Sequence, residues 1–243
     1  MPPRALNPVG VALVDKPAGP SSFALVAALR RRTRARTGHT GTLDPFATGL
    51  LVLLSGAATR LAPCFSGLDK RYVTDVDLTR TTSTGDPEGD ASDEHAPLAG
   101  PELENALESL RGEVELPIPA ASAVKVDGER AYRLARRGIA VEMPLRRSVV
   151  YSLDVLDSGE SSVRLALHVS SGTYVRSIAE ALGGHCTSLR RTTVGPFSVQ
   201  EAAPVEQVAL VPVRAAIEQL PTDAVERVPA AIVSSVLALE DAG

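Results

Sequence analysis

A single carboxylate, Asp44, lies in the stretch GHTGTLDPFATGL at residues 38–50, among Gly, Thr, Ala and Pro, with His39 five positions before it. An Asp-Pro pair suits the first two positions of a type I turn, which is one explanation for the acid. The other explanation is that small neighbours clear space around a carboxylate that attacks a substrate carbon, as carboxylate nucleophiles do in several enzyme classes. The stretch alone leaves both explanations open.

Two of the four tyrosines stand beside basic residues. Tyr72 follows Lys70 and Arg71, and Tyr174 comes two residues before Arg176 in GTYVR. Aromatic residues make up only 3% of the chain and tryptophan is absent, so these two rings are candidates for stacking on a ligand. By position alone, a core or strand tyrosine with a hydrogen-bonded hydroxyl is the stronger explanation for each.

Other site chemistries lack their motifs. The chain has no GxxxxGK[ST] phosphate loop, no GxSxG serine elbow and no paired Cys/His spacing for a metal. Cys64 and Cys186 are too few for a disulfide framework or a zinc site. We therefore expect no metal and no organic cofactor. No apolar run approaches the roughly 20 residues of a membrane helix, and the N-terminus lacks the apolar region of a signal peptide, so we expect a cytoplasmic protein without a membrane partner.

Charge is distributed unevenly along the chain. The net charge is −4, yet residues 1–71 carry +7 and residues 121–200 carry +4, whereas residues 72–120 carry −10 and residues 201–243 carry −5. Two basic segments are compatible with a protein that binds a polyanion on one face, and an evenly mixed surface is the alternative.

Hydrophobic patterning predicts an α+β fold with a mixed, mainly antiparallel sheet flanked by helices, because strands and helices alternate without a strict βαβ rhythm. Strands are predicted at 10–15, 50–55, 70–78, 148–156, 161–169 and 189–199. Helices are predicted at 23–36 with Ser22 as N-cap, at 101–112 and after the GTY turn, with short helices in the tail from about residue 201. The first helix ends in five arginines, which exceeds what capping of the helix dipole requires and favours contacts with phosphate.

Five blocks in this order resemble the TruB family of tRNA pseudouridine synthases: GHTGTLDPFATGLL, KRY, PAASAVK, GTYVR and LRRTTVGPF. The resemblance covers residues from about 10 to 200, and its first block is long and specific. It implies the pseudouridine synthase fold over residues 9–200, with a mobile thumb-like insertion at about 117–145. Residues 201–243 would be a short acidic extension, since the chain ends before the PUA-type domain that family members commonly carry could fit.

The resemblance implies that the protein converts uridine 55, in the T-loop of tRNA, to pseudouridine. The N-glycosidic bond breaks, the base turns and rejoins through C5. Asp44 would be the nucleophile, and attack on C1′, attack on the base and assistance to glycal formation all stay open. Arg176 would pair with Asp44 and hold its pKa down against desolvation. Tyr72 would stack on the flipped uridine. One of Tyr72 and Tyr174, with Tyr72 favoured, would also relay the C5 proton.

Other residues have binding roles by the same resemblance. Tyr174 and Leu189 would line the uracil pocket, and His39 would hold the flipped T-loop by stacking or phosphate contact. Candidates for contact with the RNA backbone are Lys16, Arg30, Arg31, Arg32, Arg34, Arg36, Lys125, Arg190 and Arg191. Thr193 stands where many relatives carry a basic residue, which puts one phosphate contact in doubt.

The expected partner is the T-arm of tRNA, and the chain is expected to act as a monomer without an obligatory protein partner. A first alternative is the catalytic subunit of a guide-RNA pseudouridylation complex, whose reliance on a PUA domain counts against it. A second is a tRNA chaperone, which would need neither Asp44 nor Arg176. A glycoside hydrolase is remote, because the matching blocks hold no second carboxylate.

Overall fold

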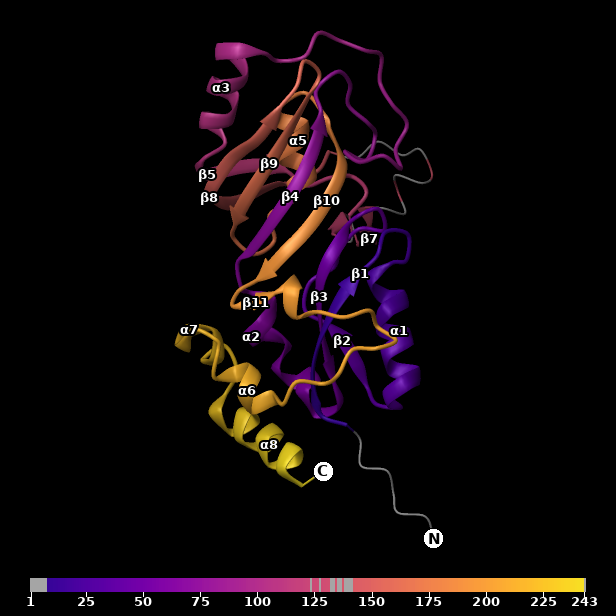
Figure 1. Cartoon of the computed structure of the whole chain (residues 1–243), viewed down its shortest axis with the longest axis vertical. Coiled ribbons are helices and arrows are strands. Elements are labelled where there is room, and N and C mark those ends of the chain that lie inside the picture. Colours follow the sequence, from indigo (N-terminus) through magenta and orange to yellow (C-terminus); the bar gives the residue numbers. More distant parts are fainter. Residues whose placement is uncertain are drawn as a thin grey trace. The chain divides into compact units, whose positions relative to one another are not determined.

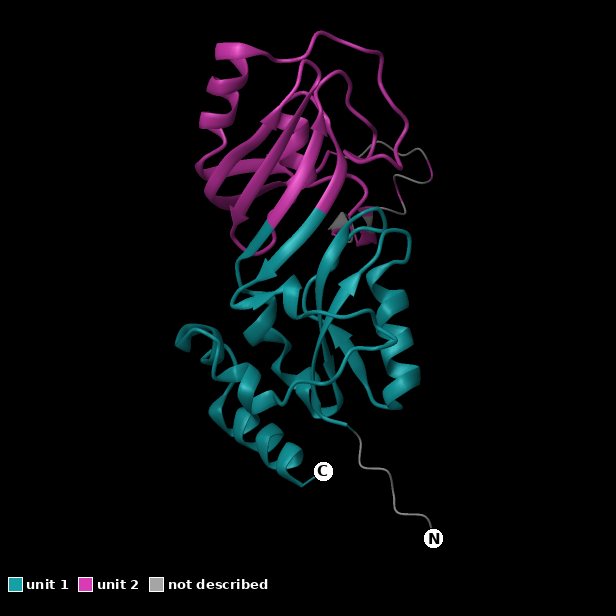
Figure 2. Ribbon diagram, in the orientation of Figure 1, with its two compact units in different colours: residues 1–71, 190–243 teal, residues 72–189 magenta. Residues whose placement is uncertain are grey.

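The computed structural model describes residues 8–122, 124–126, 128–131, 134, 137 and 142–242, with the side chains of residues 125, 126 and 130 excluded. The chain divides into two compact units, residues 1–71 with 190–243 (unit 1) and residues 72–189 (unit 2), coloured separately in Figure 2. The prediction of an α+β fold with a mixed, mainly antiparallel sheet is confirmed. About a third of the predicted insertion at 117–145 lies outside the described residues.

Unit 1 is built on a buried strand, β3 (Thr48–Ser55), at the centre of its strands in Figure 1. β1 (Gly10–Lys16) pairs antiparallel with it along its whole length, and β2 (Thr37–His39) pairs antiparallel with its end. The start of β3 pairs parallel with β10 (His185–Val194), where Gly49 lies opposite Arg191. Gly49 has φ of +100°, and a Cβ there would lie 2.2 Å from the Arg191 carbonyl oxygen, so only glycine fits this pairing.

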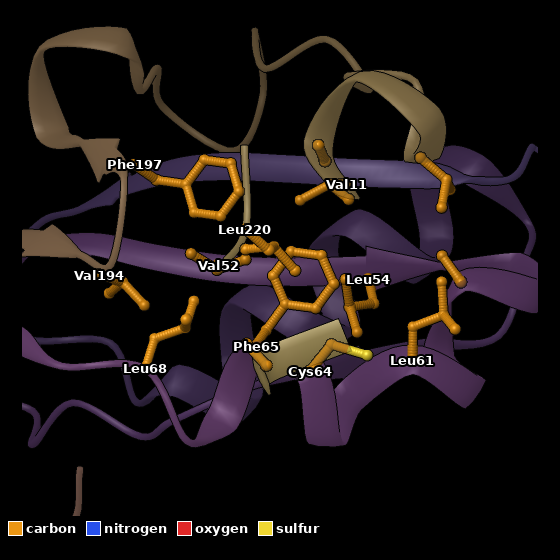
Figure 3. Close-up of a cluster of buried hydrophobic side chains, with 14 of the residues drawn as sticks. Val11, Val52, Leu54, Leu61, Cys64, Phe65, Leu68, Val194, Phe197 and Leu220 are labelled. Atoms are coloured by element: carbon orange, nitrogen blue, oxygen red, sulfur yellow. The ribbon is translucent and has the colours of Figure 1, made fainter. Parts of the chain in front are cut away.

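The apolar runs of β1 and β3 are buried on two faces. Alternate side chains, such as Val11 and Val52, point into a core formed with the 3₁₀ helix η1 (Gly56–Leu61) and α2 (Ala62–Ser66), shown in Figure 3. The intervening side chains, such as Ala12, pack with α1 (Ser22–Thr33) in a second core. Strands covered on both faces are continuously hydrophobic rather than alternating, which explains why these two segments were recognisable from sequence.

Helix α1 begins one residue earlier than predicted. Its N-cap is Ser21, whose hydroxyl accepts a hydrogen bond from the Ala24 amide at 3.2 Å, so the assignment of Ser22 as N-cap is wrong. The helix ends at Thr33 because Arg34 adopts a left-handed conformation with φ of 54°. Two of the five arginines therefore follow the helix rather than belong to it.

The tail from residue 201 packs on unit 1 as short helices, as predicted: α6 (Val213–Ile217), α7 (Thr222–Val225) and α8 (Ala230–Asp241). Leu220 and Val236 enter the same core as β3. Ahead of the helices, Ala203 exchanges backbone hydrogen bonds with Leu13 and Asp15 of β1 at 3.1 and 3.0 Å. The acidic tail is thus part of the hydrophobic core of unit 1.

Unit 2 carries the strand order β10-β4-β9-β8-β5. Its elements in chain order are β4 (Lys70–Asp77), α3 (Gly100–Ser109), β5 (Gly112–Pro117), β6 (Lys125–Val126), β7 (Glu129–Arg130), β8 (Leu145–Ser158), β9 (Ser162–Val169) and α5 (Val175–Ala181). β8 and β9 are the predicted antiparallel pair, and β4 alternates buried residues with half-buried or exposed ones, as predicted. β5 was not predicted, because its short acidic sequence gives little signal before it pairs with β8. β10 continues into unit 1, where β11 (Phe197–Ser198) follows it.

Lys70, at the start of β4, is a buried cation. It is 5% exposed, and its ammonium donates to the carbonyl oxygens of Ser66 and Leu68 at 2.8 and 2.5 Å. Burial, followed by the Arg191 guanidinium, lowers the pKa of Lys70 from 10.5 to about 8. At a pH between these two pKa values, Lys70 is protonated in the unfolded chain and mostly deprotonated in the folded chain. Raising the pH through this window therefore favours the folded state.

We expect the free energy of unfolding of the wild type to rise relative to that of Lys70→Met by about 1.4 kcal/mol per pH unit between about pH 8 and pH 10. Below about pH 7 the difference should be constant, because Lys70 is then protonated in both states. Urea unfolding of the two proteins across this pH range measures the difference in their free energies of unfolding. A difference independent of pH would show that Lys70 keeps its proton when buried.

Candidate active site

The loop that carries Asp44 is fixed to α1 on one side. The Ser22 hydroxyl donates to the Leu43 carbonyl and accepts from the Leu43 amide, each at 2.8 Å. Directly after, the Ala47 amide donates to the Asp44 carbonyl at 3.2 Å and closes a turn. Asp44 itself is half-buried. The turn explanation and the reactive-carboxylate explanation are therefore compatible, since the turn leaves Asp44 partly accessible.

A buried lysine holds the next part of this loop. Lys16 is fully buried, and its ammonium donates to the carbonyl oxygens of Pro17, Pro45 and Ala47 at 3.0, 3.0 and 2.7 Å. The prediction that Lys16 contacts the RNA backbone is wrong, because the side chain is directed into the protein. Its position at the end of an apolar segment gave no sign of this role.

A buried arginine holds both ends of the same loop. Arg191 is 2% exposed and donates through Nη2 to the Gly41 carbonyl at 3.0 Å, through Nη1 to Thr42 at 3.3 Å and through Nε to Leu50 at 2.7 Å. Arg191 is therefore not a phosphate contact, and this prediction is also wrong. Together with Ser22 and Lys16, it fixes the backbone before, beside and after Asp44.

His39 ends β2 and is half-buried. Burial, followed by the Arg191 guanidinium, lowers the pKa of His39, so its imidazole is neutral at pH 7. Its Nδ1 atom is buried and has no hydrogen-bond partner among the described residues. A neutral ring is suited to positioning by stacking or hydrogen bonding rather than to attraction of phosphate by charge.

Arg176 is held in unit 2 by a buried acid that was not predicted from the sequence. Its guanidinium lies 3.3 Å from Asp86, and the two side chains are 3% and 5% exposed. Nη1 and Nη2 also donate to the carbonyl oxygens of Thr84 and Ala121 at 2.6 and 3.1 Å. Asp86 belongs to the polar acidic segment TGDPEGD, whose composition predicts a solvated loop and gives no sign of a buried ion pair.

The segment around Asp86 approaches α5 closely. Gly85 has φ of +70°, and a Cβ there would lie 2.6 Å from Glu180 Oε1 and 3.2 Å from Arg176 Cβ. Burial raises the pKa of Glu180, an effect that Arg176 opposes and Asp86 reinforces. Glycine is required at residue 85 because the loop must come close enough for Asp86 to reach the guanidinium.

The aromatic candidates and Leu189 also lie in unit 2. Tyr72 is 8% exposed on the buried face of β4, and Leu189 is 6% exposed on β10. The two strands are neighbours, since the Thr74 hydroxyl donates to the Ser188 carbonyl at 2.7 Å. Tyr174 is half-buried at the N-cap position of α5, two residues before Arg176.

The remaining basic candidates differ in whether their side chains bind other parts of the protein. Arg30, Arg31, Arg32, Arg34 and Arg36 are all exposed, but the Arg32 guanidinium donates to the carbonyl oxygens of Val205 and Val208 in the tail. Arg190 is half-buried and forms a two-point ion pair with Asp15, with N–O distances of 3.1 and 2.9 Å. The side chain of Lys125 lies outside the described part of the chain. Phosphate contact thus stays a prediction for Arg30, Arg31, Arg34 and Arg36, while Arg32 and Arg190 have protein partners.

The candidate residues are distributed over both units. His39 and Asp44 belong to unit 1, and Tyr72, Tyr174, Arg176 and Leu189 to unit 2. The predicted ion pair between Asp44 and Arg176 would join the units and stays a prediction. Within the described ranges no group of three His, Cys, Asp or Glu residues could hold a metal, and no helix there is long and apolar enough to cross a membrane.

Comparison with known proteins identifies the family. The model for the N-terminal domain of TruB family pseudouridylate synthases matches residues 30–175. A protein of Corynebacterium jeikeium strain K411 named tRNA pseudouridine synthase B is 43% identical over 222 residues, covering 84% of this chain and 72% of the relative. The chain belongs to the TruB family of pseudouridylate synthases. A protein of the same name from Geobacillus kaustophilus is 40% identical over 215 residues, covering 82% of this chain and 75% of that TruB relative.

Solved structures agree with the TruB assignment at the level of the fold. A chain in the crystal structure of a Cbf5–Nop10–Gar1 complex superposes with a TM-score of 0.60 at 28% identity. The match covers 80% of the present chain and 50% of that chain. A chain of an H/ACA RNP bound to a substrate RNA, at 24% identity and the same TM-score, supports the shared fold alone. The pseudouridine synthase fold predicted from the sequence is thereby confirmed.

Proposed function

We infer that this TruB family member is a tRNA pseudouridine synthase, an isomerase that converts uridine 55 of the T-loop to pseudouridine. The observation that carries the inference is the Asp44 loop, which Ser22, Lys16 and Arg191 hold from three sides in a chain over 40% identical to enzymes of that name. A surface turn would need no such support. Rigid placement is what a nucleophile requires to meet a sugar or pyrimidine carbon at reacting distance.

In the proposed reaction the target uridine is extruded from the T-loop, at a cost of about a few kcal/mol. Stacking on the Tyr72 ring offsets roughly 1–3 kcal/mol of that cost, and Leu189 lines the uracil site. Asp44 attacks in its ionised form, for which Arg176 supplies the compensating charge. Attack on C1′, attack on the base and glycal formation all need this carboxylate, and Tyr72 relays the C5 proton as the new bond forms.

Two alternatives expected from sequence have less support. The catalytic subunit of a guide-RNA complex is disfavoured by the comparisons. The chain from the Cbf5 complex is 28% identical and 50% of its length is covered, whereas the synthase B relative is 43% identical and 72% of its length is covered. A tRNA chaperone without catalysis would not need the supported Asp44 loop. We keep monomeric action, recognition of the T-arm and a cytoplasmic location as parts of the proposal.

The direct test is incubation of the purified chain with an unmodified tRNA transcript, followed by mapping of pseudouridine. We expect conversion at one uridine in the T-loop and none elsewhere in the transcript. Conversion at a different uridine would contradict the substrate assignment, and binding without conversion would favour the chaperone alternative.

Removal of the Ser22 hydroxyl tests whether the loop anchor matters. Ser22→Ala is expected to lower the rate of pseudouridine formation by about tenfold to a hundredfold. The backbone amide and carbonyl of Leu43 both lose their hydrogen bonds to Ser22, so Asp44 is less precisely placed. Ser21→Ala is the matched control: it removes the α1 cap, lowers the free energy of unfolding by about 1 kcal/mol and leaves the loop bonded. Equal rate losses in the two variants would show that helix stability, not loop position, governs the rate.

Tyr72→Phe separates the two roles given to this tyrosine. The ring remains, so affinity for the T-arm should stay close to that of the wild type, while single-turnover conversion should slow by about a hundredfold or more if the hydroxyl relays the proton. A rate equal to that of the wild type would restrict Tyr72 to stacking.

A further inference from the structure

A cavity of about 470 Å³ lies in unit 1 beside the Asp44 loop. Lys16 lines it and also holds the carbonyl oxygens of Pro45 and Ala47 in that loop. Thr48, four residues after Asp44, contributes another part of the lining. The cavity and the loop therefore share a wall, and the volume is in the usual range of about 300–1,000 Å³ for a site that binds a small organic group.

The walls of the cavity are mainly apolar and partly flat. Three prolines, Pro17, Pro20 and Pro204, line it together with Leu25 from α1. Proline rings offer flat, rigid apolar surfaces that lose little conformational entropy when a planar group packs on them. Such walls suit a ring system rather than a flexible chain.

One ion pair provides most of the hydrogen-bonding capacity of the cavity. Arg190 donates to both carboxylate oxygens of Asp15 and, at 3.4 Å, to the Thr48 hydroxyl. Both residues line the cavity, and the side chains of Arg190 and Asp15 are 43% and 34% exposed. A guanidinium has five N–H donors and a carboxylate about four acceptor positions, which leaves donors and acceptors for a ligand.

The charges of the cavity argue against an anionic occupant. Lys16 and Arg190 are balanced by Asp15 and Glu206, and the Lys16 ammonium already donates to three carbonyl oxygens. No excess of positive charge is thus left to attract a phosphate or a carboxylate. A neutral, planar group with donor and acceptor edges is the complementary ligand, which describes a nucleobase.

Guanine matches this pattern on two edges. Its O6 and N7 atoms accept from an arginine, and its N1–H and N2–H groups are suited to donate to a carboxylate such as Glu206. We propose that the cavity binds a guanine of the RNA substrate, separate from the uridine on which Asp44 acts. The proposal rests on the proposed function. Since Thr48 is at most about 14 Å of chain from Asp44, one RNA molecule can occupy both sites.

Two tryptophan variants test the site, and the chain has no tryptophan of its own. Glu206→Trp places an indole at an exposed position of the lining and should block the cavity. Gln207→Trp is the matched control: residue 207 is the exposed neighbour outside the lining, and its indole should report occupancy by fluorescence without loss of activity. Guanosine should quench the Gln207→Trp signal saturably, and uridine should not.

The RNA arm uses a full tRNA transcript in which each guanosine is replaced in turn by an abasic nucleotide. For Gln207→Trp, one replacement should weaken binding by roughly tenfold, the usual effect of losing one stacked base. Glu206→Trp should bind the intact transcript about tenfold more weakly and show no further loss with that replacement. Glu206→Gln, which removes one charge with little change in size, should reproduce part of this loss.

Each result has a defined meaning. If Glu206→Trp and the guanosine replacement weaken tRNA binding additively, and guanosine does not quench the Gln207→Trp fluorescence, the proposal is overturned. Stronger quenching by adenosine or uridine than by guanosine would overturn the assignment to guanine. Saturable quenching by guanosine without coupling to any transcript position would show a site for free nucleosides and overturn the RNA assignment. If the wild type binds tRNA but forms no pseudouridine, the proposed function fails, while the quenching and coupling data still decide the occupant of the cavity.

Discussion

Replacement of Asp44 by asparagine is expected to abolish pseudouridine formation while the protein stays folded and still binds tRNA. The amide keeps the size of the side chain, and Ser22, Lys16 and Arg191 bind backbone atoms of the neighbouring residues, so we expect the variant to fold. An amide is not a nucleophile under these conditions, and we expect the single-turnover rate to fall at least about a thousandfold.

The matched control for this variant is Asp93→Asn, which makes the same chemical change at an exposed acid of the polar segment in unit 2. Its rate should equal that of the wild type. Thermal unfolding and filter binding of labelled tRNA establish that Asp44→Asn is folded and competent to bind. Undiminished conversion by Asp44→Asn would remove Asp44 from the chemistry and leave it as a turn residue.

Arg176→Met is expected to be the most destabilising of the substitutions considered. It leaves the Asp86 carboxylate, 5% exposed, without its guanidinium partner. An unpaired buried charge costs about 3–5 kcal/mol of unfolding free energy, which urea unfolding would record. Pseudouridine formation should also be lost, since Arg176 is the proposed counter-charge of Asp44.

A double variant separates these two effects. In Arg176→Met/Asp86→Asn the buried charge is gone, and the amide oxygen still accepts the hydrogen bonds from Thr84 Oγ1 and the Glu88 amide that Asp86 Oδ1 accepts now. We expect much of the stability to return and the activity to stay absent. Recovery of activity along with stability would show that Arg176 serves the fold alone.

The sequence determined the family and most of the strands. The block GHTGTLDPFATGLL is a contiguous pattern that needs no tertiary information, and the matched model and relatives confirm it. The strands at residues 10–15 and 50–55 were recognisable because burial on both faces requires continuous apolar side chains, a property that is local along the chain.

Only the tertiary structure decided what the buried charges do. Lys16 and Arg191 were predicted to meet phosphate, yet they donate to carbonyl oxygens 29–31 and 141–150 residues away in sequence. Asp86 had no local sign of its ion pair with Arg176. A charged residue has the same sequence signature whether it faces solvent or satisfies a buried group, because its partner is set by which polar atoms the fold leaves unpaired nearby.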